Sequence, residues 1–163
     1  MKYFDDLRLG DKFAVGSHLF TAEEIKAFAS RFDPQRFHLD KEAAARSHFG
    51  GLCASGWHSA SMWMRLMVDY RRRFDEERRA RGEAVVQLGA SPGFRDLKWT
   101  RPVYAGDTIT YESEVVALRV SNSRPGWGLM SLRNRGTNQS GTLVLSFVST
   151  VFIERRPELK EAS

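Results

Sequence analysis

The sequence predicts an α+β fold in which a curved antiparallel sheet wraps one long central helix. Apolar residues recur at helical spacing from residue 56 to about residue 80, and shorter helical patterns come before them. After residue 93 the period changes, and long segments rich in β-branched residues follow. A meander of such strands can bury the helix that precedes it, so we expect the sheet to curve around that helix.

Local signals place the elements of the first part of the chain. Residues 12–20 alternate in polarity and predict a strand. Thr21 and Glu24 form a capping box that starts a helix. This helix ends before Pro34, because proline disfavours helical geometry in the residue before it. The face of the helix that we expect to be buried carries Ile25, Phe28, Ala29 and Phe32.

The remaining elements follow from the same kinds of signal. A loop over residues 33–38 leads to a short helix over residues 40–46, which begins at the favoured capping residue Asp40. The long helix is apolar over much of its circumference, which indicates that other elements surround it. The predicted strands of the second half cover residues 85–90, 94–101, 108–120, 126–134 and 142–154.

Size, charge and composition restrict the class of protein. With 163 residues, 42% of them hydrophobic, the chain is expected to form one domain over residues 1–163. The single cysteine is typical of a reducing cytoplasm, and no segment reads as a signal peptide or a membrane helix. Most of the net charge of +5 comes from residues 70–81, where acids interrupt the bases. We therefore expect a solvated helix face there and no nucleic-acid or membrane partner.

Asp33 and His38 stand five positions apart in a loop that helices hold at both ends. A carboxylate beside an imidazole can hold a water molecule, remove its proton and return a proton elsewhere. Hydration of an α,β-unsaturated thioester needs a deprotonated water at the β-carbon and a proton at the α-carbon. It also needs a hydrogen-bond donor for the carbonyl oxygen, where negative charge develops. The unpaired N–H groups at the start of the long helix, around Gly56, suit that task. The spacing alone is also explained without catalysis, with Asp33 as a helix cap and His38 as a hydrogen-bonded imidazole.

The segment FASRFDPQRFHLDKEAAARSHFGGLCASGWHSASMW, residues 28–63, resembles the signature of MaoC-like dehydratases, the (R)-specific enoyl-CoA hydratases of the hotdog fold. That signature has an Asp, four residues, a His, a short helix led by Asp, Phe-Gly, and a small residue with Gly at the opening of the central helix. The later segment LKWTRPVYAGDTITYESEV resembles the family's strand, Pro-Val, Gly-Asp turn and following strand. The resemblance extends over roughly residues 20–154.

This resemblance implies a hotdog fold and an acyl-CoA hydratase or dehydratase, a hydro-lyase that uses no cofactor. Asp33 and His38 match the family's catalytic pair, and Gly56 matches the glycine whose N–H forms the oxyanion hole. Two positions depart from the family pattern. Gln-Arg stands at residues 35–36, where Asn-Pro is frequent, and Met64 replaces a serine of characterised hydratases. The first departure leaves the pair intact, whereas the second removes a polar contact and bears on the substrate type.

Four residues that follow Gly56 are the candidates for contact with substrate: Trp57, His58, Met62 and Trp63. A role in the core explains the tryptophans and Met62 equally well. No arrangement of His, Cys, Asp and Glu has the spacing of a metal site, so no metal is expected.

Two alternative functions remain open at this point. A hotdog thioesterase would carry its acid on the central helix, where Asp69 is the one acid before the charged run and falls late in the helix. The other alternative is a non-catalytic acyl-CoA binder or the partner subunit of a dehydratase. In each case the expected ligand is acyl-CoA or another acyl thioester. The resemblance also implies a homodimer, which would cover the open edge of the sheet.

Overall fold

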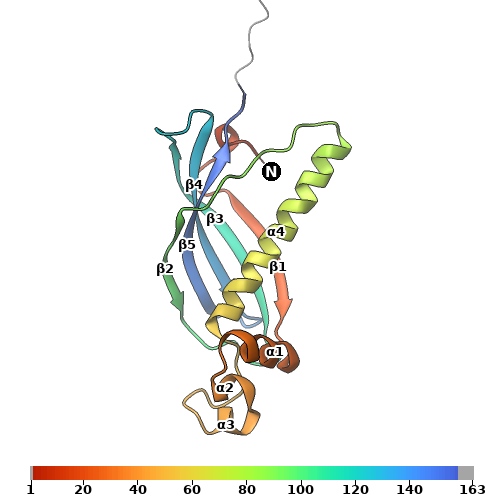
Figure 1. Cartoon of the computed structure of the whole chain (residues 1–163), viewed down its shortest axis with the longest axis vertical. Helices are drawn as coiled ribbons and strands as arrows, with labels where there is room; N and C mark the ends of the chain where they lie inside the picture. The colour runs from red at the N-terminus through yellow and green to blue at the C-terminus, as the bar shows by residue number, and fades with distance from the viewer. Residues whose placement is uncertain (1, 158–163) are drawn as a thin grey trace, which may run out of the picture.

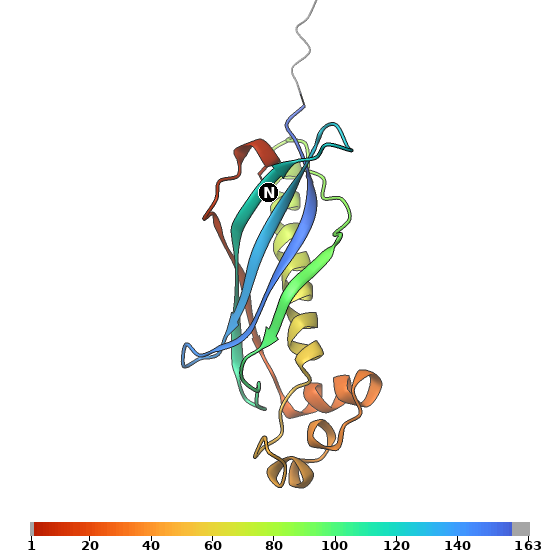
Figure 2. The same ribbon diagram turned by 90° about the vertical axis from the view of Figure 1, so that its left-hand side faces the viewer.

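A five-stranded antiparallel sheet and one long helix dominate the computed structural model, which describes residues 2–157 (Figure 1). The strands lie in the order β1-β3-β4-β5-β2. The long helix α4 (Gly56–Ala80) crosses one face of the sheet, which curves along it (Figure 2). The strands are β1 (Lys12–Leu19), β2 (Gly93–Trp99), β3 (Thr108–Val120), β4 (Trp127–Thr137) and β5 (Leu143–Glu154). The predicted α+β class, with a sheet that follows a long helix, is confirmed.

Three short helices gather at the end of the molecule where α4 begins (Figure 2). They are α1 (Ala22–Phe32), α2 (Arg36–Leu39) and α3 (Lys41–Ala45). The predicted capping box is present, because the side chain of Thr21 accepts from the Glu24 N–H while the Glu24 carboxylate accepts from the Thr21 N–H. A 3-10 helix, η1 (Phe4–Asp6), packs against β4.

Alternation along the strands builds the core between the sheet and α4. In β4, Met130, Leu132 and Asn134 are buried, whereas Arg133 and Arg135 on the opposite face are exposed. This period of two is what a sheet with one covered face requires.

A chain of hydrogen bonds crosses this core beneath α4. The indole N–H of Trp63 donates to Ser113 at 3.5 Å, and the Ser113 hydroxyl donates to the Asn134 amide oxygen at 2.7 Å. The Asn134 amide then donates to Ser149 Oγ at 2.9 Å. Ser149 interrupts the apolar face of β5 because the buried amide needs an acceptor. The network also holds Trp63 over the middle of the sheet.

Residues 85–90 do not form the strand that the sequence predicts. Only an isolated bridge from Leu88 to Ile153 forms there, with separate bonds such as the one from the Gly89 N–H to the Phe152 carbonyl at 2.9 Å. A Cβ atom at residue 89 would lie 2.9 Å from the Cβ of Phe152. The chain therefore passes β5 too closely for a side chain at this position, and no regular ladder continues through it.

Two predicted boundaries also differ from the structure. The loop over residues 33–38 contains the short helix α2, and β4 continues past residue 134 to Thr137. The predicted strand over residues 126–134 leaves Gly136 in the connection to the next strand, but Gly136 lies inside β4. A Cβ there would lie 3.1 Å from side-chain atoms of Ile109 and Tyr111, so this glycine serves close packing.

The helix α4 is not enclosed on all sides by its own chain. Met64 and Val68 on its outer flank are 52% and 54% exposed, and Phe94 on the neighbouring strand β2 is 58% exposed. The expectation that other elements surround the helix is wrong for a single chain, because the five strands cover only one side of it. Phe32, expected in the core, is likewise exposed at the end of α1.

His58 joins α1 to α4 as an aromatic ring. It stacks on Phe28 of α1, with 4.5 Å between the ring centroids, and it meets the ring of Phe20 edge-on at 5.0 Å. Burial lowers the pKa of His58 to about 4, and the neighbouring His18 acts in the same direction. The imidazole is therefore neutral at physiological pH.

We expect acid to destabilise the fold through His58. The unfolded chain takes up a proton on this residue near pH 6.5 and the folded chain only near pH 4, so the free energy of unfolding falls as the pH drops through that interval. The contribution of His58 to this loss is roughly 3 kcal/mol. His58→Phe, which keeps the stacking, should weaken the pH dependence measured by urea denaturation. Exposed His48 offers the control His48→Gln, and equal pH slopes in His58→Phe and wild type would contradict this assignment.

Candidate active site

A sharp turn between α1 and α2 presents Asp33 and His38 together. Asp33 caps the end of α1, where its N–H donates to the Ala29 carbonyl at 2.9 Å. Helix α2 starts at Arg36 and carries His38, which is 5% exposed. The helix ends fix both residues of the predicted pair, with the imidazole inside and the carboxylate partly open to solvent.

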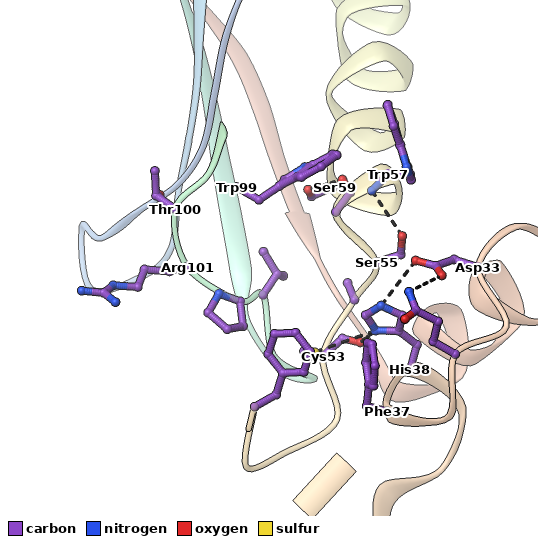
Figure 3. Close-up of a pocket in the computed structure, with 16 residues that line it drawn as sticks. Asp33, Phe37, His38, Cys53, Ser55, Trp57, Ser59, Trp99, Thr100 and Arg101 are labelled. Carbon is purple, nitrogen blue, oxygen red and sulfur yellow. Dashed lines mark hydrogen bonds and ion pairs between the residues drawn. The ribbon is translucent and has the colours of Figure 1, made fainter. Parts of the chain in front are cut away.

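The ring of His38 is held from both sides. Its Nε2 lies 3.4 Å from Asp33 Oδ2, and its Nδ1 lies 2.7 Å from the carbonyl oxygen of Cys53 (Figure 3). Because a carbonyl oxygen only accepts hydrogen bonds, Nδ1 carries the proton. Nε2 faces Asp33. Whenever Nε2 is unprotonated, its lone pair and the Asp33 carboxylate point toward the same place, an arrangement that suits a water molecule donating to both.

Asp33 remains ionised at neutral pH. Partial burial acts to raise the pKa of its carboxyl group. Hydrogen bonds from Ser55 and Gln35, together with the positive charge that His38 carries when it is protonated, outweigh burial and hold the pKa below its ordinary value. The amide of Gln35 donates to Asp33 Oδ1 at 2.7 Å, so one of the positions that depart from the family pattern contacts this carboxylate directly.

The N-terminus of α4 lies beside this pair, with Ser55 as its cap. Ser55 Oγ accepts from the Trp57 N–H at 3.3 Å and also hydrogen-bonds to Asp33. Among residues 2–157, no acceptor takes the N–H of Gly56. An unpaired N–H at the positive end of a 25-residue helix is suited to a developing oxyanion.

These groups share a cavity of about 410 Å³ (Figure 3). One wall comes from the turn between α1 and α2, and another from the segment that enters α4. The third wall is formed by residues 99–103 at the end of β2. Its lining is mostly apolar, with Asp33, His38 and Ser55 on one side and Thr100 and Arg101 on the other (Figure 3). A mainly apolar cleft with a few polar groups is the usual character of a small-molecule site.

The four residues expected to contact substrate separate into two groups. Trp57 lines the cavity. His58 is buried against Phe28, Met62 packs against the core, and Trp63 belongs to it. The structure brings these three residues near the first turns of α4 but not to the cavity that holds Asp33.

Several lining residues are absent from the sequence prediction, among them Ser55, Ser59 and Trp99. Ser55 directly precedes the long helix, so its capping role could have been predicted from its residue type. The Ser59 hydroxyl donates to the Gly56 carbonyl at 2.7 Å within the first turn. Trp99 arrives from the distant strand β2, and no local signal in the sequence indicates its contact with α4.

Other classes of site find no support in the described part of the chain. No group of three or more His, Cys, Asp or Glu side chains in residues 2–157 is arranged to hold a metal ion. Over the same residues, no helix combines enough length with enough apolar character to span a bilayer. Helix α4 has the length, but charged residues crowd its second half.

The chain belongs to the MaoC-like dehydratase family, because the model of the MaoC like domain matches residues 10–125. The matched range includes the Asp33–His38 turn and the start of α4. The helix lying on a curved antiparallel sheet is the hotdog fold of this family's structural neighbours. The family and fold that the sequence motifs implied are thus confirmed.

Three relatives show how far this similarity extends. A MaoC-like dehydratase from Rhodospirillum rubrum is 38% identical, with a TM-score of 0.80 over 96% of this chain and 99% of that one. The (R)-hydratase from A. caviae involved in PHA biosynthesis is 27% identical, with a TM-score of 0.63 over 93% and 98% of the two chains. The mesaconyl-CoA hydratase of Cereibacter sphaeroides is 41% identical over 73 residues, or 45% of this chain. The matched part is only 20% of the length of that hydratase.

We expect Cys53 to be unreactive in the folded protein. Burial raises the pKa of its thiol to about 11, and the residue is 1% exposed. At pH 8 only about one such thiol in a thousand is ionised, and access is blocked as well. Labelling with a thiol reagent should be slow in buffer and rapid in urea. Because the chain has one cysteine, rapid labelling of the native protein would directly contradict this geometry.

Proposed function

We propose that this protein hydrates an α,β-unsaturated acyl thioester, or dehydrates the corresponding hydroxyacyl thioester. The observation that carries the proposal is the position of Asp33 and His38, 3.4 Å apart, in one cavity with the unpaired N–H of Gly56. The family match supports a hydratase or dehydratase, and so does the similarity to proteins named (R)-hydratase and mesaconyl-CoA hydratase. The substrate that fits this chemistry is acyl-CoA or another acyl thioester, with no cofactor.

The dyad activates water through two acceptors. Asp33 Oδ2 and His38 Nε2 each take a hydrogen bond from the same water molecule, which leaves a lone pair of its oxygen free for attack. As the oxygen bonds to the β-carbon, the dyad accepts the proton that the water loses. The negative charge of Asp33 stabilises the imidazolium, and the Cys53 carbonyl keeps the ring in place.

The proton balance closes within the same dyad. Attack at the β-carbon moves electrons to the thioester oxygen, and the Gly56 N–H stabilises the enolate. The dyad then returns its proton to the α-carbon. One water molecule is added across the double bond, the dyad is regenerated, and the reverse sequence describes dehydration.

The geometry disfavours the thioesterase alternative. Asp69, the acid expected for that chemistry, pairs with Arg65 at 2.9 Å and with Arg72 at 2.8 Å on the surface of α4. It does not line the cavity that contains Gly56. A water activated by Asp69 would therefore have no route to a carbonyl held at the start of the helix.

The test is the loss of absorbance at the enoyl-thioester band when the protein meets a panel of enoyl-CoAs. Asp33→Asn should lower kcat/KM by roughly 10²–10⁴-fold, because it removes the negative charge and one acceptor. Asp69→Asn is the matched control, since it makes the same chemical change outside the cavity, and it should leave the rate unchanged.

The products distinguish the alternatives. Hydroxyacyl-CoA supports the proposal, whereas release of free CoA would assign a thioesterase. Binding of acyl-CoA with no turnover of linear, branched or carboxylated substrates would assign a non-catalytic binder or a partner subunit.

We also propose that the protein is a homodimer that covers the open side of α4 and β2. Strand β2 lies at the edge of the sheet, where β5 is its one partner among the described strands, and most of its residues are exposed. Beside it lies an apolar flank with Met64, Val68 and Phe94 exposed. An edge strand with apolar neighbours of this extent is a surface that proteins normally cover.

Light scattering at micromolar concentration should give the mass of two chains. Val68→Arg places a charge in the apolar flank and should shift the mass toward that of one chain. Leu19→Arg is the control, because Leu19 is similarly exposed on β1 at the opposite edge of the sheet. A single-chain mass for the wild type would overturn the dimer.

A further inference from the structure

The side chain of Trp99 packs directly on the first residue of α4. A Cβ atom at Gly56 would lie 2.5 Å from Trp99 Cε2 and 2.7 Å from its Nε1, so only glycine fits beneath this indole. Trp99 belongs to β2, and its ring reaches across the cavity to the helix (Figure 3). The glycine that leaves an N–H for the substrate is thus also the contact point of an indole from the sheet.

A second tryptophan completes a wall at this point. Trp57 meets Trp99 edge to face, with 5.1 Å between ring centroids and 77° between the ring planes. The two rings are 51% and 44% exposed, and both line the cavity that contains Asp33. Aromatic pairs in this geometry attract each other, which favours contact between the two rings.

Behind this wall an apolar groove runs along α4. Its first part, about 120 Å³, lies between α4 and the strands β2 and β5, with Ala60 on its helical side and Leu97 on β2. Its second part, about 270 Å³, continues along the helix past Met67 and shares Met64 with the first part. Within residues 2–157, Trp57 is the one residue that lines both the first part of the groove and the catalytic cavity.

We propose that Trp99, closed on Trp57, separates the catalytic cavity from this groove and restricts the enzyme to short acyl groups. The proposal rests on the proposed function, because it places the acyl thioester at Gly56. The cavity of about 410 Å³ must hold the thioester and part of the carrier arm as well as the acyl group. A longer chain would need the space behind the two rings, and removal of the Trp99 ring would make that space continuous with the cavity.

Binding of saturated acyl-CoAs measures the effect without requiring turnover. In calorimetric titrations we expect wild type to bind octanoyl-CoA no more tightly than butanoyl-CoA. In Trp99→Ala the longer chain enters the groove, and octanoyl-CoA should bind at least about tenfold more tightly than butanoyl-CoA. Trp99→Leu, which keeps an apolar contact with Gly56, should show the same trend if the alanine variant folds poorly.

Two further variants test whether the groove itself receives the chain. Ala60→Phe added to Trp99→Ala fills the first part of the groove and should abolish the gain for octanoyl-CoA. Trp127→Ala is the matched control, because it removes an indole from β4 outside the cavity and should keep the wild-type pattern. In each variant, the rates of hydration of the enoyl-CoAs of the same two chain lengths should rank in the same order as the affinities for butanoyl-CoA and octanoyl-CoA.

The outcomes test separately the barrier that Trp99 and Trp57 form, here called the gate, and the proposed hydratase function. Tight binding of octanoyl-CoA by wild type, or a gain that survives Ala60→Phe, would overturn the gate. Length-selective binding that changes in Trp99→Ala, with no hydration by any variant, would support the gate and overturn the hydratase. If neither the wild type nor Trp99→Ala binds any acyl-CoA, both the gate and the proposed hydratase function would be overturned.

Discussion

The site depends on residues 53–56, the junction through which the chain enters α4. The carbonyl oxygen of Cys53 holds His38, and the N–H of Ala54 donates to the Val103 carbonyl at 2.7 Å. Ser55 caps the helix and hydrogen-bonds to Asp33. Gly56 has no side chain, which lets Trp99 pack on the helix. A shift of this short segment would therefore move the imidazole, the carboxylate and the helix N-terminus together.

Backbone groups supply much of the chemistry at this junction. A main-chain carbonyl fixes the tautomer of His38, and a main-chain N–H of α4 is the donor available to an oxyanion. Such groups cannot rotate away as side chains do, so they are preorganised for the reaction. Asp33 is kept charged by hydrogen bonds from Ser55 and Gln35 and by the neighbouring His38.

Local signals in the sequence predicted the features that depend on neighbours in the chain. The capping box at Thr21, the end of α1 before Pro34 and the start of α4 at Gly56 all follow from residue types a few positions apart. These predictions of helix ends succeeded because hydrogen bonds within a turn or a helix end involve only adjacent residues. The spacing of Asp33 and His38 also indicated the candidate pair, whose catalytic role stays a prediction.

The sequence by itself determined the order of elements, the family motifs and the candidate dyad. Only the tertiary structure decided which groups surround them. Gly136 looked like a turn but lies in a strand beside Tyr111, and His58 looked like a pocket residue but stacks on α1. The contact of Trp99 with α4 likewise joins segments far apart in the chain. Such contacts depend on how the sheet packs on the helix, and that packing leaves no periodic pattern in the sequence of either partner.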